Sequence, residues 1–231
     1  MIQQYQFLSS YLQNLSDQLC VRNAAIQQTL QPKVQIFGNR EEFDNADRCI
    51  KFSGSGCKYY VLLCDGMGTG PAAVQESKNA SGLLRRLLSA GFPAEYALRS
   101  FNSLCALRER PSAATVDLLQ VDLSSGKASL YKWGAAASYL LSGGTVERLG
   151  HISPPPGLSV TGCQETTEHF SMRKSERLVL LSDGIGETEA IQVCMKNPTA
   201  DNRYLAELLL DTARAGGEDD ATVVIVELEG I

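Results

Sequence analysis

Two apolar runs of the chain end in the same way. Residues 59–64 are apolar or aromatic without polar alternation, and they lead directly into Asp65 and then into glycines. Residues 178–181 are also apolar and lead into Asp183, which is again followed by glycine. A short run of this kind is typical of a strand that is buried on both faces. The pattern therefore predicts two strands that each place an aspartate at the end of a sheet.

A third acidic segment stands before the last apolar run. The sequence Gly-Gly-Glu-Asp-Asp-Ala-Thr at 216–222 precedes the apolar residues 223–226. Carboxylates that converge repel one another unless they are protonated or bind cations. Because Mg²⁺ and Mn²⁺ prefer carboxylate, carbonyl and water oxygens, the three acid-bearing strand ends indicate a divalent metal site.

The order of the predicted elements favours an α+β fold. Strands come first, then two helices, then several strands, then two helices and a final strand, which differs from the β-α-β alternation of a parallel sheet. We predict antiparallel sheets with helices packed outside them. The predicted helices cover 72–90, 93–107, 188–196 and 203–214, and the predicted strands cover 34–37, 49–52, 58–64, 115–123, 128–133, 139–141, 145–146, 165–172 and 222–228.

The first 31 residues form a separate predicted segment. They contain no glycine or proline, and apolar residues recur in steps of three and four, as on one face of a helix. We therefore divide the chain into an N-terminal helical segment, 1–31, and a domain, 32–231. The segment is predicted to serve in dimerisation or regulation, and packing on the following domain is an equally open alternative. The apolar positions are Tyr5, Leu8, Leu12, Leu15 and Leu19.

Composition narrows the class of protein. The chain has 231 residues, of which 44% are hydrophobic, and a net charge of -5 without a basic cluster, which argues against a nucleic-acid surface. We find no signal peptide and no apolar run near the roughly 18 residues that span a bilayer. The seven cysteines are scattered without a Cys-x-x-Cys pair, as expected for a reduced, cytoplasmic protein.

Other chemistries fit the sequence less well. The glycine-rich turn at 66–70 resembles a dinucleotide-binding turn, but Asp65 before it would repel a pyrophosphate unless a metal intervened. No P-loop sequence occurs. Neither His151 nor His169 lies in an acidic motif, and Ser182 has no nearby histidine or lysine in sequence to activate it as a nucleophile. A nucleotide-binding domain remains the less favoured alternative.

Paired aspartates at strand ends have a coherent use in hydrolysis. Two metal ions bridged by a carboxylate and a water would lower the pKa of that water and provide a nucleophile near neutral pH. The same ions would hold phosphoryl oxygens and offset the charge of the leaving oxygen. No covalent intermediate is needed.

The motifs together resemble those of the metal-dependent serine/threonine phosphatases of the protein phosphatase 2C (PPM) superfamily. Within it, the chain is most similar to the phosphatase domain of the stage II sporulation protein E family, over about residues 47–228. Each motif alone is weak, but their order is specific. The resemblance is carried by Asp-Gly-Met-Gly-Thr-Gly at 65–70, Ser-Asp-Gly at 182–184 and the acidic segment 216–222, with further similarity at 115–123, 132–134 and 155–158.

The resemblance implies an α-β-β-α four-layer sandwich with two Mn²⁺ or Mg²⁺ ions at one edge. By position, Asp65 would bridge both ions, the carbonyl of Gly66 would bind one, and Asp183 and Asp219 would be further ligands. Asp47 matches a fifth ligand, although Ala46 stands where the family has glycine. The polar stretch 38–47 taken alone predicts a solvated loop, so both interpretations of Asp47 are retained. Asp65 and Asp183 are the predicted catalytic residues, and Asp220 is expected to support the ligands.

The resemblance also implies a function. It suggests a protein serine/threonine phosphatase whose substrate is a phosphorylated anti-sigma-factor antagonist, so that dephosphorylation would free a sporulation sigma factor. Relatives carry a helical element that controls the enzyme through dimer contacts, and residues 1–31 match that description. Because family members are often tethered to membranes, the chain is also compatible with the cytosolic domain of a tethered protein. A non-catalytic relative that uses the fold for binding or sensing is the main alternative.

Overall fold

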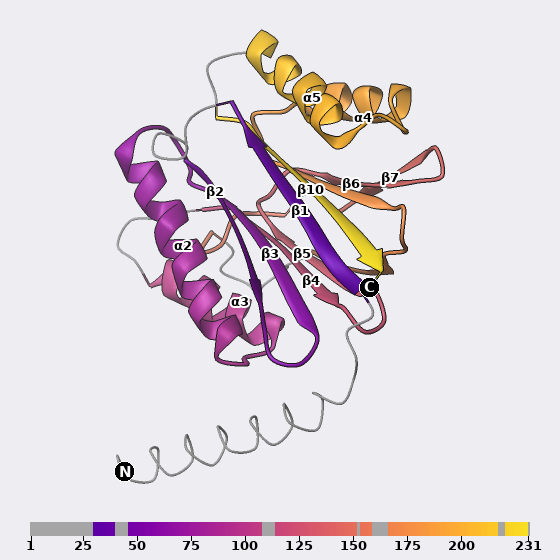
Figure 1. The fold of residues 1–231 in the computed structure, drawn as a ribbon. Helices are drawn as coiled ribbons and strands as arrows, with labels where there is room; N and C mark the ends of the chain where they lie inside the picture. The colour runs from indigo at the N-terminus through magenta and orange to yellow at the C-terminus, as the bar shows by residue number, and fades with distance from the viewer. Residues whose placement is uncertain are drawn as a thin grey trace, which may run out of the picture.

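Two antiparallel sheets stack face to face, and a pair of helices covers the outer face of each sheet (Figure 1). The structure is a computed structural model that describes residues 30–39, 46–107, 114–151, 153–158, 166–216 and 220–230. The predicted α-β-β-α sandwich is therefore confirmed. Residues 1–29 of the predicted N-terminal helical segment, 1–31, lie outside the described residues, and its last two, Leu30 and Gln31, begin a β-strand rather than end a helix.

The first sheet carries the second predicted aspartate. Its strands lie in the order β1-β10-β9-β6-β7, and every neighbouring pair is antiparallel. Helices α4 (Glu187–Lys196) and α5 (Asn202–Gly216) cover its outer face (Figure 1). The strands are β1 (Leu30–Gly38), β6 (Ser138–Ser142), β7 (Thr145–Leu149), β9 (Arg177–Leu181) and β10 (Thr222–Gly230).

The second sheet carries the first predicted aspartate. Its strands lie in the order β2-β3-β4-β5-β8, again with antiparallel neighbours. Helices α2 (Pro71–Ser89) and α3 (Ala94–Ala106) pack on its outer face. The strands are β2 (Asp47–Ser53), β3 (Lys58–Asp65), β4 (Val116–Asp122), β5 (Lys127–Trp133) and β8 (Thr166–Ser171).

The apolar runs form three core layers because successive side chains of a strand point to opposite faces. In β3, Leu62 and Cys64 pack under the helices α2 and α3, whereas Val61 and Leu63 face the other sheet. Both faces of the central strands are therefore buried, which is why their sequences lack polar alternation. No helix among the described residues is long and apolar enough to cross a lipid bilayer.

The predicted elements agree with the structure to within about two residues at most ends, with two informative differences. Strand β1 begins at Leu30 and contains Pro32, where the sequence suggested a boundary. A proline is tolerated there because β1 is an edge strand of its sheet. The predicted loop at 38–47 ends earlier than expected, because Asp47 is the first residue of β2 and only 7% exposed.

Candidate metal centre

The predicted site lies at one edge of the sandwich, where strands of both sheets begin or end. In the second sheet, β2 begins with Asp47 and β3 ends with Asp65, and the two residues stand directly opposite each other in the antiparallel register. In the first sheet, β9 ends just before Ser182 and Asp183. The side chains of Asp47 and Asp65 are buried, and Asp183 is exposed. The fold thus brings Asp47, which the polar sequence around it left ambiguous, beside Asp65.

The glycines after the two aspartates are required by close backbone contacts. A Cβ atom on Gly66 would lie 2.0 Å from the carbonyl oxygen of Ala73, in the first turn of α2. A Cβ atom on Gly184 would lie 2.0 Å from the carbonyl oxygen of Asp220. Only glycine allows the backbone to approach so closely. Each Asp-Gly pair therefore turns the chain tightly at the edge and leaves the aspartate at the rim.

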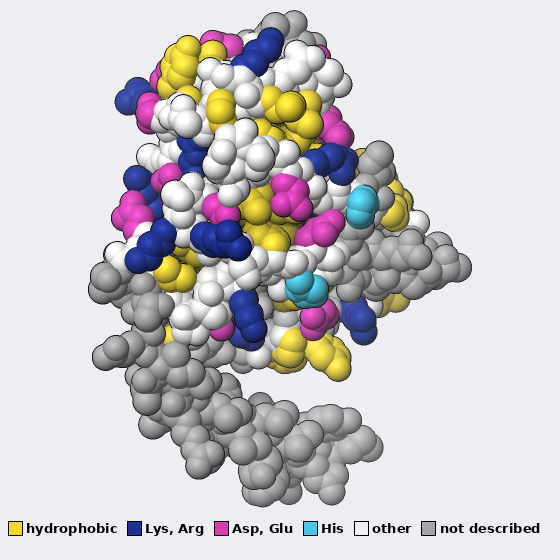
Figure 2. Space-filling view, turned by 90° about the vertical axis from the view of Figure 1, so that its right-hand side faces the viewer, with side chains coloured by type: hydrophobic (Ala, Val, Ile, Leu, Met, Phe, Trp, Pro, Cys, Tyr) yellow, Lys and Arg dark blue, Asp and Glu magenta, His cyan; other side chains and the backbone are white. Residues whose placement is uncertain are grey.

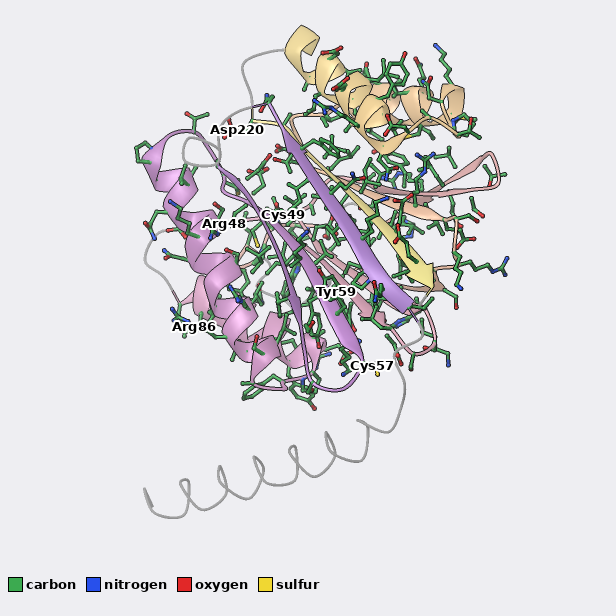
Figure 3. All side chains as sticks on the ribbon, in the orientation of Figure 1. Arg48, Cys49, Cys57, Tyr59, Arg86 and Asp220 are labelled. Atoms are coloured by element: carbon green, nitrogen blue, oxygen red, sulfur yellow. The ribbon has the colours of Figure 1, made fainter. Side chains whose placement is uncertain are left out.

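A hydrogen bond joins the two sheets at this edge. The amide of Ala46 donates to Oδ2 of Asp220 at 2.6 Å, and the carbonyl of Ala46 accepts from the amide of Gly66 at 3.2 Å. Ala46 is therefore held between the strand that contains Asp65 and the start of β10. Figure 3 shows Asp220 at this edge, at the opposite end of the sandwich from Cys57 and Tyr59. Asp220 therefore lies at the edge where the metal ligands are predicted, and its supporting role stays a prediction.

Thr115, just before β4, holds the backbone of Asp65 from both sides. Its amide donates to the carbonyl of Asp65 at 2.8 Å, and its Oγ1 accepts from the amide of Asp65 at 3.2 Å. Thr115 itself is 9% exposed. These two bonds fix the peptide groups on either side of the Asp65 side chain, so its orientation does not depend on the turn alone.

The environment of Asp65 opposes the ionised form of its carboxyl group. Burial acts first, and the charges of Asp47 and Asp183 add to it, so that the pKa of Asp65 rises to about 10. A carboxyl group that is desolvated and surrounded by like charges holds its proton unless a cation compensates. The influence of Asp183 on this pKa also shows that the aspartates of the two sheets lie close enough to interact.

Asp47 is shifted in the same direction but less strongly. Burial raises its pKa to about 6, while nearby hydroxyl groups of Ser182 and Thr222 act to lower it and the charge of Asp220 acts to raise it. Ser182 is itself tied to the start of β10, because its Oγ accepts from the amide of Thr222 at 2.8 Å. Asp47 is therefore more easily ionised than Asp65 at neutral pH.

The donor chemistry of this edge fits divalent cations. Asp47, Asp65 and Asp183 supply carboxylate oxygens from three segments, and their mutual repulsion is what a bound Mg²⁺ or Mn²⁺ would relieve. Among the described residues, no three His, Cys, Asp or Glu side chains already stand in a metal-binding arrangement. Asp219, a predicted ligand, lies outside the part of the chain that the structure describes.

Two supporting residues were not predicted from the sequence. Thr115 and Thr222 lie in the recognised motifs, but their contacts with Asp65 and Asp47 depend on the pairing of distant strands. Histidine plays no visible part at this edge, since Figure 2 shows histidine side chains at the surface and neither His151 nor His169 is among the groups that shift the pKa of Asp47 or Asp65.

This combination of fold and site defines a class of protein. The chain has the fold of the protein phosphatase 2C domains, and it superimposes with a TM-score of 0.78 on the PP2C phosphatase domain and regulatory-domain fragment of SpoIIE from Bacillus subtilis. The match covers 89% of this chain and 64% of that one at 22% sequence identity.

Sequence comparison then gives the family. Residues 55–229 match the family described as Stage II sporulation protein E (SpoIIE), and the chain belongs to this family. It is 30% identical over 186 residues to the stage II sporulation protein E of Bacillus subtilis (strain 168) and 28% identical over 186 residues to that of Priestia megaterium. Each match covers 74% of this chain, but only 22% and 32% of those two proteins, so the chain spans less than a third of either relative.

Proposed function

We propose that the chain is a metal-dependent protein serine/threonine phosphatase. The observation that carries this proposal is the convergence of Asp47, Asp65 and Asp183 from both sheets at one edge, with the pKa of Asp65 raised to about 10 by burial and by the other two acids. Such an arrangement is unfavourable without cations and is suited to hold them. Membership of the SpoIIE family and the PP2C fold support the same activity.

In this mechanism the protein contributes the ligands and their geometry. Two Mn²⁺ or Mg²⁺ ions would be held by Asp65 together with the carbonyl of Gly66, Asp47, Asp183 and Asp219. The bound ions would supply an activated water and offset negative charge on the phosphoryl oxygens. Thr115 keeps the Asp65 peptide in place through its two hydrogen bonds.

The buried acids and the exposed acid of the site are suited to different roles. Asp47 and Asp65 are 7% and 9% exposed, whereas Asp183 is exposed. The buried pair is suited to hold cations away from bulk water, and Asp183 lies where a phosphorylated side chain of another protein can reach it. Approach of a large substrate from the rim requires no opening of the sandwich.

Phosphate release tests the activity. We would follow Mn²⁺-dependent release of phosphate from a phosphoserine protein by wild type, Asp183→Ala and the surface control Glu207→Ala, whose side chain pairs with Arg203 on the exposed face of α5. Wild type and the control should release phosphate at equal rates. The rate for Asp183→Ala should be at least a hundredfold lower, while its melting temperature stays that of wild type. Wild type that binds Mn²⁺ but releases no phosphate would favour a binding or sensing module. Stabilisation by ATP or NAD without metal would favour nucleotide binding.

The substrate class follows from the family and is proposed with it. We expect a phosphorylated anti-sigma-factor antagonist, in which phosphoserine or phosphothreonine is exposed on a folded partner. A set of phosphoproteins of this kind should be dephosphorylated faster than a short phosphopeptide of the same local sequence, since docking of the folded partner would add binding energy. Equal rates on both substrates would contradict recognition of a folded partner.

We also propose that the N-terminal helical segment, 1–31, acts in dimerisation or regulation of the domain, 32–231. Its apolar residues recur at helical spacing, and the first described strand begins at Leu30. Deleting residues 1–29 leaves β1 complete. The shortened chain should differ from the full chain in molecular mass in solution or in phosphate release, and no difference in either measurement would refute this role.

A further inference from the structure

A buried polar cluster lies in the core between the two sheets, close to the acidic edge. Nζ of Lys132 donates to Oδ2 of Asp117 and to Oγ of Ser138, the latter at 2.7 Å, and Oγ of Ser138 donates to Oδ2 of Asp117 at 3.2 Å. The side chains of Lys132 and Asp117 are each 1% exposed, and Ser138 is fully buried. Charged groups are rarely buried so completely without a specific reason.

The cluster spans both sheets. Asp117 belongs to β4 and Lys132 to β5 of the second sheet, where they stand opposite each other in the register. Ser138 is the first residue of β6 in the first sheet. The apolar contacts between the sheets resist separation but are not directional, whereas these hydrogen bonds fix which atoms meet across the gap.

The cluster is adjacent to the strands that carry the acids. In the second sheet, Asp117 pairs with Leu63, two residues before Asp65, and it follows Thr115, which holds the Asp65 backbone, by two residues. In the first sheet, β6 pairs with β9, the strand that leads to Asp183. In each sheet, the cluster therefore lies next to the acidic edge, on or beside the strand that carries the aspartate.

We propose that Asp117, Lys132 and Ser138 form a positioning group that sets the separation of the two sheets at the acidic edge, and with it the spacing of Asp65 and Asp183. This inference rests on the function proposed above, because two cations can be shared only by acids at a fixed separation. None of the three residues is among the proposed metal ligands. They act through the backbone of β4 and the pairing of β6 with β9.

A neutral double variant separates this role from a contribution to stability alone. Asp117→Asn with Lys132→Met keeps the side-chain volumes but removes both charges and the bonds of the ammonium group. Because replacing both members of a buried ion pair is far less disruptive than removing one, we expect the variant to fold. At a temperature where it is fully folded, its affinity for Mn²⁺ should fall at least tenfold, and kcat for phosphate release should fall more than KM rises.

The matched control removes another buried cation, remote from the acidic edge. Arg177 begins β9, at the end of the strand away from Asp183, and its guanidinium donates to the carbonyls of Pro198 and Ala200 and to Asn202. Arg177→Met should lower the melting temperature while leaving Mn²⁺ affinity and kcat of the folded molecules within twofold of wild type. The proposal is overturned if the double variant also stays within twofold of wild type.

Amide hydrogen exchange in the absence of metal tests the positioning role of the cluster independently of enzymatic activity. The double variant should exchange the Asp65 amide, which donates to Thr115, at least ten times faster than wild type, with little change at Val224 in β10. A uniform rise across both sheets, or no rise at Asp65, would overturn the proposal. If the double variant does not fold, Ser138→Ala, which removes only the contact from the first sheet, must show the same local rise. If wild type neither binds Mn²⁺ nor releases phosphate, the proposed function is refuted. Amide exchange at Asp65 then still decides whether the cluster positions the acidic edge.

Discussion

The acidic edge should destabilise the metal-free protein, and removing one acid should therefore stabilise it. Asp65 is the strongest case because burial and the charges of Asp47 and Asp183 raise its pKa to about 10 from an ordinary value of 3.8. At neutral pH the folded chain must hold this proton, whereas the unfolded chain releases it. We predict that Asp65→Asn, which cannot ionise and keeps the shape of the side chain, increases the free energy of unfolding in the absence of metal.

The size of the effect follows from the two pKa values. One pH unit corresponds to about 1.4 kcal/mol of difference between the protonation states, and pH 7 lies roughly three units above the unfolded pKa of Asp65. The gain for Asp65→Asn at pH 7 is therefore at most about 4 kcal/mol, and at pH 5 at most about 2 kcal/mol. Because the folded state holds this extra proton, the contribution of Asp65 to the free energy of unfolding of wild type falls as pH rises from about 4 toward about 10, and the stability gained by Asp65→Asn grows over the same range.

Urea unfolding in the presence of EDTA at pH 5 and pH 7 measures how much the free energy of unfolding of Asp65→Asn exceeds that of wild type. The matched control is Asp122→Asn, because hydrogen bonds to Ser124 and Ser125 lower the pKa of Asp122 against the opposing effect of burial. The control should be less stable than wild type by the same amount at pH 5 and pH 7, because the pKa of Asp122 does not exceed its ordinary value of 3.8 in either state and the carboxyl group is ionised at both pH values. If Asp65→Asn were less stable than wild type, or if its advantage did not grow from pH 5 to pH 7, the description of the edge as a site of repelling carboxylates would be wrong.

Two further predictions concern the first Asp-Gly turn and the metal. Gly66→Ala should lower the free energy of unfolding by more than about 2 kcal/mol in urea, because its Cβ would lie 2.0 Å from the carbonyl oxygen of Ala73. Gly82→Ala, inside α2 with no atom within 4 Å of its Cβ, should instead add up to about 1 kcal/mol. Mn²⁺ at a hundred times its dissociation constant should stabilise wild type in thermal unfolding by about 2.7 kcal/mol for each ion bound, and an equal gain in Asp65→Asn would contradict the assignment of that ligand.

The fold and the two main acids could be predicted because local sequence determines them. Uninterrupted apolar runs predict buried strands, and the contacts that demand Gly66 and Gly184 leave a visible Asp-Gly pair after each strand. The position of Asp65 and Asp183 at strand ends therefore follows from short stretches of chain. The order of the family motifs along the chain then indicates the family, which no single motif does.

The surroundings of the acids could not be predicted in the same way because they depend on pairing between distant strands. Asp47 lies in a polar stretch without alternation, and only the register of β2 with β3 places it opposite Asp65. The sequence alone does not predict that Lys132 is buried. Its burial follows from the positions of Asp117 and Ser138, which come from two different sheets.

A titration of Mn²⁺ into the metal-free chain, with bound metal and phosphate release measured on the same samples, tests the central claim most directly. Two ions should bind per chain in wild type, phosphate release from a phosphoserine protein should rise with occupancy, and Asp65→Ala should lose both. Phosphate release that persists in EDTA, or in Asp65→Ala, would contradict a metal-dependent phosphatase site at this edge of the sandwich.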